Sequence, residues 1–132
     1  MSAPGCFIGL MSGTSLDGVD GVLACFDAPF QVLAHASAPF DTALRAELQA
    51  LNTPGPNELH RAALAANALV EVYARVVVAL LTQSQLRPQD VRAIGAHGQT
   101  VRHQPGLHDG VGYTLQLNQP ALLAERCGID VV

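Results

Sequence analysis

Hydrophobic and polar positions divide the first forty residues into three extended segments. An apolar run begins at Phe7, gives way to small and hydroxyl-bearing residues between Ser12 and Asp20, and resumes until about Asp27. This pattern predicts two strands joined by a polar turn. Residues 30–36 form a third segment whose imperfect alternation indicates that both faces are partly covered. The short connections predict an antiparallel three-stranded meander.

The middle of the chain has helical spacing. Asp41 or Thr42 can cap a short helix that ends at Asn52. After a breaker at residues 53–57, apolar residues recur every three or four positions up to about Gln83. This spacing predicts one long helix, capped by Asn57, that lies along one face of the sheet. Its expected inward stripe is Leu59, Ala63, Ala66, Val70, Tyr73, Val77 and Leu80.

Shorter elements follow the long helix. Residues 91–96 are typical of a short buried strand, and residues 113–117 alternate like a half-exposed strand. Between them, residues 99–112 are rich in Gly, His and polar side chains, which predicts a loop that could include a small strand at its start. The Asp109–Gly110 pair predicts a turn.

The chain closes with a helix and the start of a strand. Asn118 or Gln119 can cap the helix, with Pro120 in its first turn, and Gly128 ends it. A last strand begins at residue 129. Without the short helix that ends at Asn52 and the strand at residues 113–117, the order is β-β-β-α-β-α-β. This order is similar to that of ribonuclease H-like domains, which have a mixed sheet with an antiparallel meander, then parallel strands and crossover helices. These domains pair in the actin, Hsp70 and sugar-kinase superfamily, where the first turn binds nucleotide phosphates.

Composition sets limits on size, partners and compartment. A chain of 132 residues that is 49% hydrophobic and 14% charged predicts one domain with its own core. A net charge of −4 argues against a non-specific nucleic-acid binder, and the absence of lysine excludes the lysine-containing P-loop motif. The longest apolar run, residues 76–81, is too short for a membrane span, and Met1–Gly5 has no leader pattern. We therefore expect a cytoplasmic protein with no membrane partner.

Cysteines and histidines do not form a recognisable framework. Cys6, Cys25 and Cys127 are odd in number and scattered, which predicts three free, reduced, small apolar side chains. Three histidines in the last third of the chain, at positions 97, 103 and 108, match no usual zinc spacing. The sequence therefore predicts neither a disulfide nor a structural metal.

The polar segment between the first two strands carries the clearest candidate chemistry. It is longer than a turn that only reverses the chain. Glycines at 13 and 18 let the backbone approach a ligand, and the hydroxyls of Ser12, Thr14 and Ser15 can donate to phosphate oxygens. Asp17 and Asp20 could hold Mg²⁺ directly or through water. Alternatively, the hydroxyls satisfy local backbone groups and either aspartate caps the turn.

A second candidate segment, residues 96–103, follows the strand at residues 91–96. Open α/β sheets place ligands outside the carboxyl ends of their strands. The side chains of His97, Gln99, Thr100 and Arg102 could orient a sugar hydroxyl or carboxylate, the arginine in bidentate fashion. The alternative is a structural loop in which His97 bonds backbone groups. The residues alone do not favour either interpretation.

Taken together, three motifs resemble a known family. GLMSGTSLDGVD (residues 9–20), AIGAHGQTVRHQPG (93–106) and YTLQLNQPALLAERCGIDVV (113–132) closely resemble the N-terminal part of the anhydro-N-acetylmuramic acid kinase family. Members are bacterial enzymes of peptidoglycan recycling that use ATP and Mg²⁺. They add water across the 1,6-anhydro bond of anhydro-N-acetylmuramic acid and phosphorylate O6, which gives N-acetylmuramic acid 6-phosphate.

The resemblance implies roles for both candidate segments. The ATP phosphate loop would comprise Ser12, Gly13, Thr14, Ser15, Leu16, Asp17, Gly18, Val19 and Asp20. The sugar pocket would be lined by His97, Gly98, Gln99, Thr100 and Arg102, with Thr100 nearest the sugar. Met11 stands where the wider superfamily usually has an aspartate, although methionine is usual there in this family, so metal binding is not assigned to that position.

Family members are well over twice as long as this chain. Their water-activating aspartate and adenine pocket belong to later segments that do not occur here. We therefore expect residues 1–132 to form one ribonuclease H-like lobe, the N-terminal half of a two-domain kinase, inactive without the missing C-terminal lobe. Apolar surface where that lobe docks would favour self-association into a homodimer. The alternative is a non-catalytic module of the same fold that binds phosphate or sugar.

Overall fold

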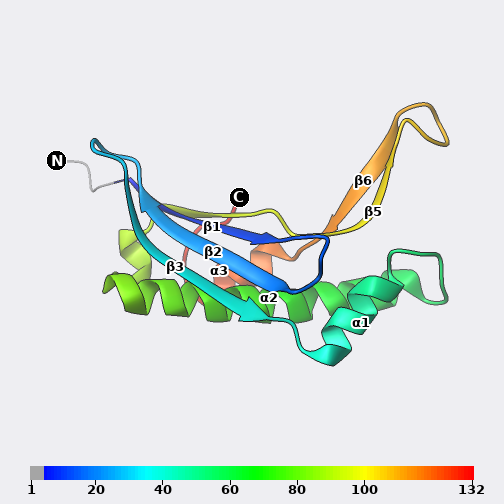
Figure 1. The fold of residues 1–132 in the computed structure, drawn as a ribbon, viewed down its shortest axis with the longest axis horizontal. Helices are drawn as coiled ribbons and strands as arrows, with labels where there is room; N and C mark the ends of the chain where they lie inside the picture. The colour runs from blue at the N-terminus through cyan, green and yellow to red at the C-terminus, as the bar shows by residue number, and fades with distance from the viewer. Residues whose placement is uncertain (1–4) are drawn as a thin grey trace.

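A computed structural model describes residues 5–132, so most of the Met1–Gly5 segment considered above lies outside it. Ten elements follow one another along the chain (Figure 1). They are β1 (Cys6–Ser12), β2 (Gly18–Cys25), β3 (Gln31–Pro39), α1 (Thr42–Ala50), α2 (Glu58–Ser84), the 3₁₀ turn η1 (Pro88–Asp90), β4 (Ala93–Ala96), β5 (Gln99–Pro105), β6 (Gly112–Leu117) and α3 (Pro120–Cys127).

A mixed four-stranded sheet with the order β3-β2-β1-β4 forms the centre of the molecule. β1 and β2 pair antiparallel, as do β2 and β3, whereas β4 runs parallel to β1. This arrangement confirms the predicted meander and the mixed α/β fold class. The expected last strand is reduced to a single parallel bridge between Ile94 and Val131.

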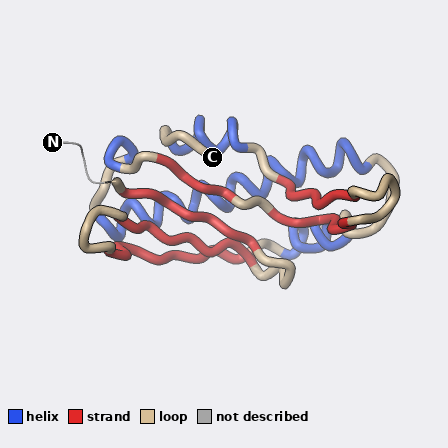
Figure 2. Tube along the Cα trace, turned by 90° about the horizontal axis from the view of Figure 1, so that it is seen from above, coloured by secondary structure: helices blue, strands red, loops and turns tan. Residues whose placement is uncertain are grey.

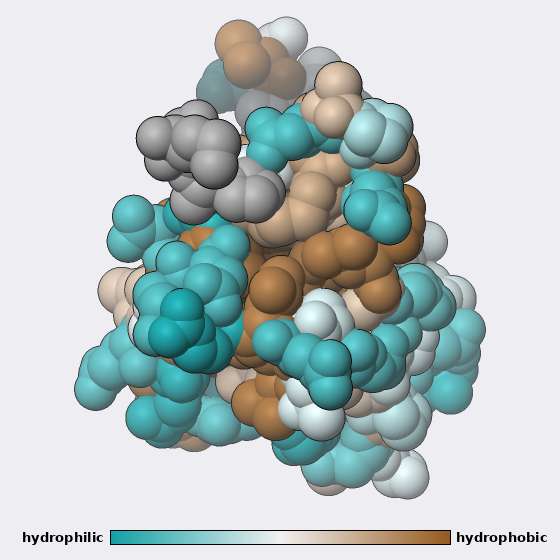
Figure 3. Space-filling model, turned by 90° about the vertical axis from the view of Figure 1, so that its left-hand side faces the viewer, coloured by the Kyte–Doolittle hydropathy of each residue, from teal (hydrophilic) through white to brown (hydrophobic). Residues whose placement is uncertain are grey.

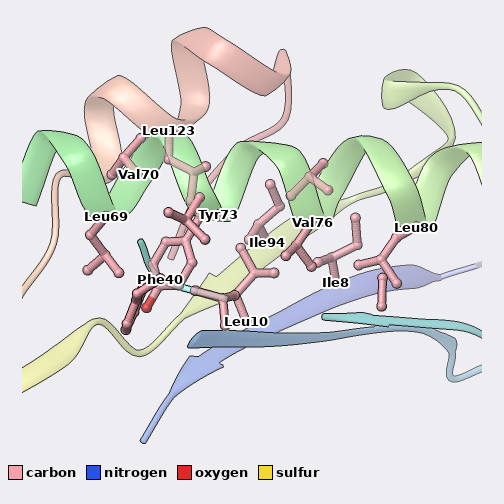
Figure 4. Packing of buried hydrophobic residues seen from close by; sticks show 14 of the residues in the cluster. Ile8, Leu10, Phe40, Leu69, Val70, Tyr73, Val76, Leu80, Ile94 and Leu123 are labelled. Carbon is pink, nitrogen blue, oxygen red and sulfur yellow. The ribbon is translucent and has the colours of Figure 1, made fainter. Parts of the chain in front are cut away.

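The helices lie on one side of this sheet. Alternate residues of β1 (Cys6, Ile8, Leu10 and Ser12) are buried, so this strand turns every second side chain toward the helices. Figure 4 shows Ile8 and Leu10 facing Val76 and Leu80 of α2, with Ile94 of β4 close by. Figure 2 looks onto the opposite face of the sheet, which none of the described helices covers.

The long helix was predicted with nearly correct bounds, but the start of its inward stripe was wrong. Leu59 is 91% exposed and Ala63 is also exposed, and the buried face begins at Ala65. The reason is visible in Figure 1, where α2 begins beyond the end of the sheet, beside α1. By length and composition α2 could cross a membrane, yet 56% of its most apolar window is buried within the domain, as in a core helix.

The helix ends largely follow the predicted caps. The Asp41 carboxylate accepts a hydrogen bond from the Leu44 N–H at 2.7 Å, and α1 begins at the next residue. Asn57 occupies the position before α2 without a side-chain cap bond. Gly128 ends α3 in the left-handed conformation, with φ of 68°.

The segment predicted as a loop at residues 99–112 is mostly a strand. β5 and β6 form a separate two-stranded antiparallel sheet, and only the tip between Pro105 and Gly112 is a turn. At that tip the Asp109 carboxylate accepts from the N–H groups of Val111 and Gly112 at 3.0 and 2.8 Å, as expected of an Asp–Gly turn. These backbone donors, Gly112 first, hold the pKa of Asp109 below its usual value.

The prediction of three free cysteines was wrong for two of them. The register of β1 and β2 sets Cys6 directly opposite Cys25, and the two form a disulfide. Their separation of 19 positions gave no hint of pairing, because the contact depends on the strand register rather than on sequence spacing. Cys127 is free and half-buried, and burial raises the pKa of its thiol.

An aromatic cluster lies at the end of the sheet remote from the β1–β2 turn. The rings of Phe7 and Phe26 have centroids 5.8 Å apart, and those of Phe26 and Phe30 are 5.2 Å apart. All three side chains are exposed. Figure 3 shows the side of the molecule that is on the left in Figure 1, where apolar side chains reach the surface.

Candidate functional site

The two candidate segments meet at one end of the sheet. β1 and β4 are parallel neighbours, so the chain leaves both strands at the same edge. The N–H of His97, just after β4, donates to the Leu10 carbonyl of β1 at 3.2 Å. The loop after β1, residues 13–17, and the second segment, residues 97–100, therefore lie side by side.

The loop after β1 has unused backbone donors. A tight turn is closed by the Leu16 N–H, which donates to the Gly13 carbonyl at 3.1 Å, and Leu16 is buried with φ of 59°. The N–H groups of Thr14 and Ser15, between these residues, have no acceptor within the described part of the chain. Both residues are exposed. Successive free N–H groups of this kind form a concave site for an anion.

Gly18 fixes the far end of this loop. A Cβ atom at this position would collide with the Ala38 carbonyl and approach the Pro39 Cα to 2.7 Å. The Phe40 N–H also donates to the Asp17 carbonyl at 3.2 Å. The end of β3 therefore packs against the loop so closely that only glycine fits at position 18.

A hollow of about 450 Å³ opens beside this loop. Of the residues predicted from the sequence, it is lined by Gly13, Ser15, Asp17, Gly18, Val19 and Asp20. Met11 and residues 37–39 complete the wall. The sequence analysis missed the contribution of β3, because nothing in the composition of residues 37–39 signals a ligand.

The two aspartates of the loop differ in their surroundings. Asp17 is largely exposed and lies 3.8 Å from Arg45, so its side chain is directed toward α1 rather than capping the turn. The Asp20 carboxylate accepts a hydrogen bond from Ser37 at 2.6 Å. Within residues 5–132 no group of three or more His, Cys, Asp or Glu side chains could enclose a metal. Two carboxylates on one hollow still suit Mg²⁺, which usually binds one or two carboxylates together with substrate phosphates and water.

The second segment has most of its side chains already engaged. His97 is exposed, with Nδ1 3.1 Å from the Gly98 carbonyl oxygen. The Thr100 hydroxyl is half-buried and accepts from the Gln116 amide at 3.1 Å, which leaves its proton free to donate. Gly98 has φ of +83°, and a Cβ there would lie 2.5 Å from the Leu117 carbonyl oxygen, so this position also requires glycine.

Arg102 ties the β5–β6 hairpin to the helices. Its Nε donates to the Leu51 carbonyl at 3.1 Å, and its guanidinium pairs with the Glu58 carboxylate. Tyr113 and Glu58 together raise the pKa of Arg102. In this arrangement the guanidinium faces the ends of α1 and α2, and the structure does not bring it together with the loop after β1.

A buried polar cluster connects the two segments. The Ser12 hydroxyl donates to the Gly98 carbonyl at 3.2 Å and lies 3.5 Å from the Tyr73 hydroxyl. The Gln99 amide donates to the Gly13 carbonyl at 3.1 Å. Ser12, Tyr73 and Gln99 are all buried, and burial raises the pKa of Tyr73, opposed by its hydrogen bonds to Ser12 and Gly98. The sequence analysis took Tyr73 for a simple core residue and did not anticipate this cluster.

Comparison with known proteins gives a consistent result. The family model described as "Anhydro-N-acetylmuramic acid kinase" matches residues 5–132. Relatives named anhydro-N-acetylmuramic acid kinase from Albidiferax ferrireducens and Variovorax paradoxus are each 68% identical over 127 residues, which is 96% of this chain and 33% or 34% of the relative. One from Bordetella petrii is 65% identical over 136 residues, covering 100% of this chain and 35% of its own length. The chain spans about a third of the length of these curated relatives.

Proposed function

Because the chain belongs to the anhydro-N-acetylmuramic acid kinase family, we propose that it is the phosphate- and sugar-binding lobe of an ATP-dependent sugar kinase. The complete enzyme hydrolyses the 1,6-anhydro ring of anhydro-N-acetylmuramic acid and transfers the γ-phosphoryl group of ATP to O6. Its product is N-acetylmuramic acid 6-phosphate. The reaction belongs to peptidoglycan recycling in the cytoplasm.

One observation carries this proposal: the N–H groups of Thr14 and Ser15 have no acceptor among the described residues, and Ser15 lines a hollow together with Asp17 and Asp20. The segment that carries Thr100 is bonded to this loop through Gln99, which donates to the Gly13 carbonyl. The N–H groups, with the hydroxyls of the same two residues, can donate to phosphate oxygens without rearranging the backbone. Preorganised donors of this kind stabilise the charge that develops during phosphoryl transfer.

The metal requirement fits the donors of the loop. Asp17 and Asp20 line the hollow and would hold Mg²⁺ through one carboxylate or through water. A metal ion held by these carboxylates would supply positive charge to offset the negative charge of the phosphate groups. The Ser37 hydroxyl restricts the Asp20 carboxylate to one orientation, which favours Asp20 as the more defined partner.

The sugar would lie against the second segment. Thr100 can donate its hydroxyl proton because Gln116 already occupies one acceptor position. His97 is exposed at the same edge and can contact a sugar hydroxyl through its free ring nitrogen. Both residues then orient the sugar so that O6 points toward the phosphate loop, which is the proximity that phosphoryl transfer needs.

Two functions of the reaction have no candidate among these residues. The resemblance implies that the group that activates water and the pocket for adenine belong to later segments, and the chain spans only about a third of its relatives' length. Phosphoryl transfer depends on groups positioned on both sides of the transferred phosphate. We therefore expect residues 1–132 alone to bind phosphate and sugar weakly and to be inactive.

A product assay tests the proposal. The full gene product that carries this chain is incubated with ATP, Mg²⁺ and the anhydro sugar in ¹⁸O-labelled water, and products are identified by mass spectrometry. We expect ADP and a sugar 6-phosphate with one ¹⁸O at C1. Absence of ADP formation, or phosphorylation with the anhydro ring intact, would overturn the proposal.

A further inference from the structure

We infer that Gln99 is a positioning residue that fixes the phosphate loop relative to the sugar-binding segment, and that Ser12 completes the same brace from the opposite side. This inference deepens the proposed function and rests on it. It assigns to Gln99 a role different from the sugar contact that the sequence implied. Three features of the structure support this role: the hydrogen bonds between the two loops, the complete burial of Gln99, and the two hydrogen bonds accepted by the Gly13 carbonyl.

A side chain from each loop donates a hydrogen bond to a backbone carbonyl of the other loop. Ser12, at the end of β1, donates its hydroxyl proton to the Gly98 carbonyl at 3.2 Å. Gln99, at the start of β5, donates its amide to the Gly13 carbonyl at 3.1 Å. These two bonds join residues 86 positions apart and run in opposite directions. Such a reciprocal pair restricts sliding of one loop past the other more than a single bond would.

Gln99 is completely buried, with 0% of its surface exposed. Its side-chain nitrogen donates to the carbonyls of Gly13 and Thr100, which fixes the orientation of the amide. The side-chain oxygen is buried and has no hydrogen-bond partner among the described residues. A ligand cannot reach this side chain unless the loops separate, so a direct sugar contact is not available in this conformation.

The unsatisfied oxygen makes the presence of glutamine informative. Burying an acceptor without a partner costs free energy, and an apolar side chain of the same shape would avoid that cost. Packing alone therefore does not account for glutamine at position 99. Its two donated hydrogen bonds do, because one ends on the phosphate loop and the other on Thr100, the residue assigned to the sugar.

The bond to Gly13 also determines which way the loop faces. The Gly13 carbonyl receives both the Leu16 N–H and the Gln99 amide, and both donors come from the protein interior. With this carbonyl directed inward, the N–H groups of Thr14 and Ser15 have no acceptor among the described residues, and Ser15 lines the hollow. The brace thus keeps the Gly13 carbonyl oxygen from facing the phosphate. It also sets the distance between the phosphate loop and Thr100.

Replacement of Gln99 by methionine separates positioning from packing. Methionine is nearly isosteric and lacks donors, so the Gln99→Met variant should keep its melting temperature within a few degrees of wild type, since volume-conserving core changes cost little. Misplacing reacting groups by about 1 Å can cost about 100-fold in rate. For the full gene product we expect kcat per folded molecule to fall about 100-fold, while the KM for the anhydro sugar and the Kd for Mg²⁺·AMP-PNP change less than about threefold.

Two further variants complete the test. Ser12→Ala should show the same split between kcat and KM, and the double variant should lose less activity than the product of the two single losses, because both residues act on one brace. Gln104→Met is the matched control. Gln104 lies on the same strand, and among the described residues its side chain bonds only His108 at the hairpin tip. We therefore expect kcat to stay within about twofold of wild type.

The outcomes are distinct. A raised KM for the sugar with unchanged kcat would show a direct sugar contact and overturn the inference, and so would an unchanged kcat in folded Gln99→Met. If the wild-type product lacks kinase activity, the proposed function fails, yet the brace is still tested by ¹H–¹⁵N spectra. In that case Gln99→Met should shift the Thr14, Ser15 and Leu16 amide signals, and spectra unchanged at these amides would overturn the brace.

Discussion

The two loops of the candidate site would provide binding groups in opposite ways. The loop after β1 has backbone N–H groups, at Thr14 and Ser15, with no acceptor among the described residues, and Ser15 lines a hollow. The segment after β4 has most of its side chains already bonded to protein, which leaves the Thr100 hydroxyl and the exposed His97 ring for a ligand. In the proposed function, the first loop would bind through its backbone, and the second would hold a few side chains in fixed positions.

The contrast has a physical basis. Phosphate is recognised mainly by charge and by many similar donors, so a backbone turn can bind it without specific side chains. A sugar is recognised through the direction of individual hydroxyl groups, which requires side chains held in one orientation. The buried hydrogen bonds of the second segment provide that rigidity.

The largest expected effect comes from a substitution that disrupts the loop after β1. Gly18→Ala places a methyl group against the Ala38 carbonyl and Pro39. We expect this overpacking to lower the free energy of unfolding by about 3 kcal/mol and to weaken Mg²⁺·AMP-PNP binding at least tenfold. Thermal unfolding and calorimetry measure the two effects. Gly9→Ala is the control, because its Cβ would make an ordinary contact, 3.7 Å from a Val22 methyl group, and unchanged binding in both variants would contradict the loop's role.

The second prediction concerns the Thr100 hydroxyl on the segment after β4. Thr100→Val removes the hydroxyl and keeps the shape, so kcat/KM for the sugar should fall by about 10- to 100-fold, as for loss of a hydrogen bond to substrate. Nucleotide affinity should stay unchanged. Thr100→Ser should restore most activity, and Thr114→Val, on the neighbouring strand, is the matched control. An equal loss from both valine variants would assign the effect to the hairpin rather than to the hydroxyl.

The third prediction tests whether Arg102 stabilises the fold or contacts the sugar. Arg102→Met removes the bonds to Leu51 and Glu58 but keeps the aliphatic stem. We expect a small decrease in the free energy of unfolding, measured by urea titration, because charged hydrogen bonds are lost from a partly exposed site. The KM for the sugar should be unchanged. A selective rise in that KM, without loss of stability, would place the guanidinium in the sugar pocket after all.

The smallest effect is a pH dependence outside the physiological range. Burial raises the pKa of Tyr73 above the ordinary value of 10.0, so the folded state keeps the phenol proton where the unfolded chain loses it. The stability from this difference is complete below pH 10.0 and is lost as pH rises through the folded-state pKa. Urea titrations from pH 8 to 11 should show this decline in wild type and a weaker one in Tyr73→Phe. Identical pH profiles would contradict the assignment.

The parts of the molecule that the sequence could predict depend on local signals. The polar turn between two apolar runs predicts the β1–β2 turn, and the spacing of apolar residues predicts α2 almost to the residue. The β5 strand was expected at most as a small strand at the start of a loop, because its Gly, His and polar composition lacks the pattern of a core strand and its partner among the described strands is β6.

The details of the site that could not be predicted from the sequence depend on contacts between distant residues. The bonds from Ser12 to Gly98 and from Gln99 to Gly13 each span 86 positions, and the wall formed by residues 37–39 follows from the pairing of β2 with β3. A motif identifies which residues matter, but only the sheet register shows which of them face the ligand and which hold the others. For Gln99 this difference changes its role from contact to support.

The Cys6–Cys25 disulfide changes the covalent connectivity around the loop after β1. The bond joins the outer ends of β1 and β2, so the two strands and the whole turn between them form a closed ring. Hydrolysis of one peptide bond in the exposed turn would open the ring without releasing a fragment, and both new ends would stay attached to the sheet until the disulfide is reduced. The most exposed part of the candidate site is thus the part that a single backbone cut cannot detach.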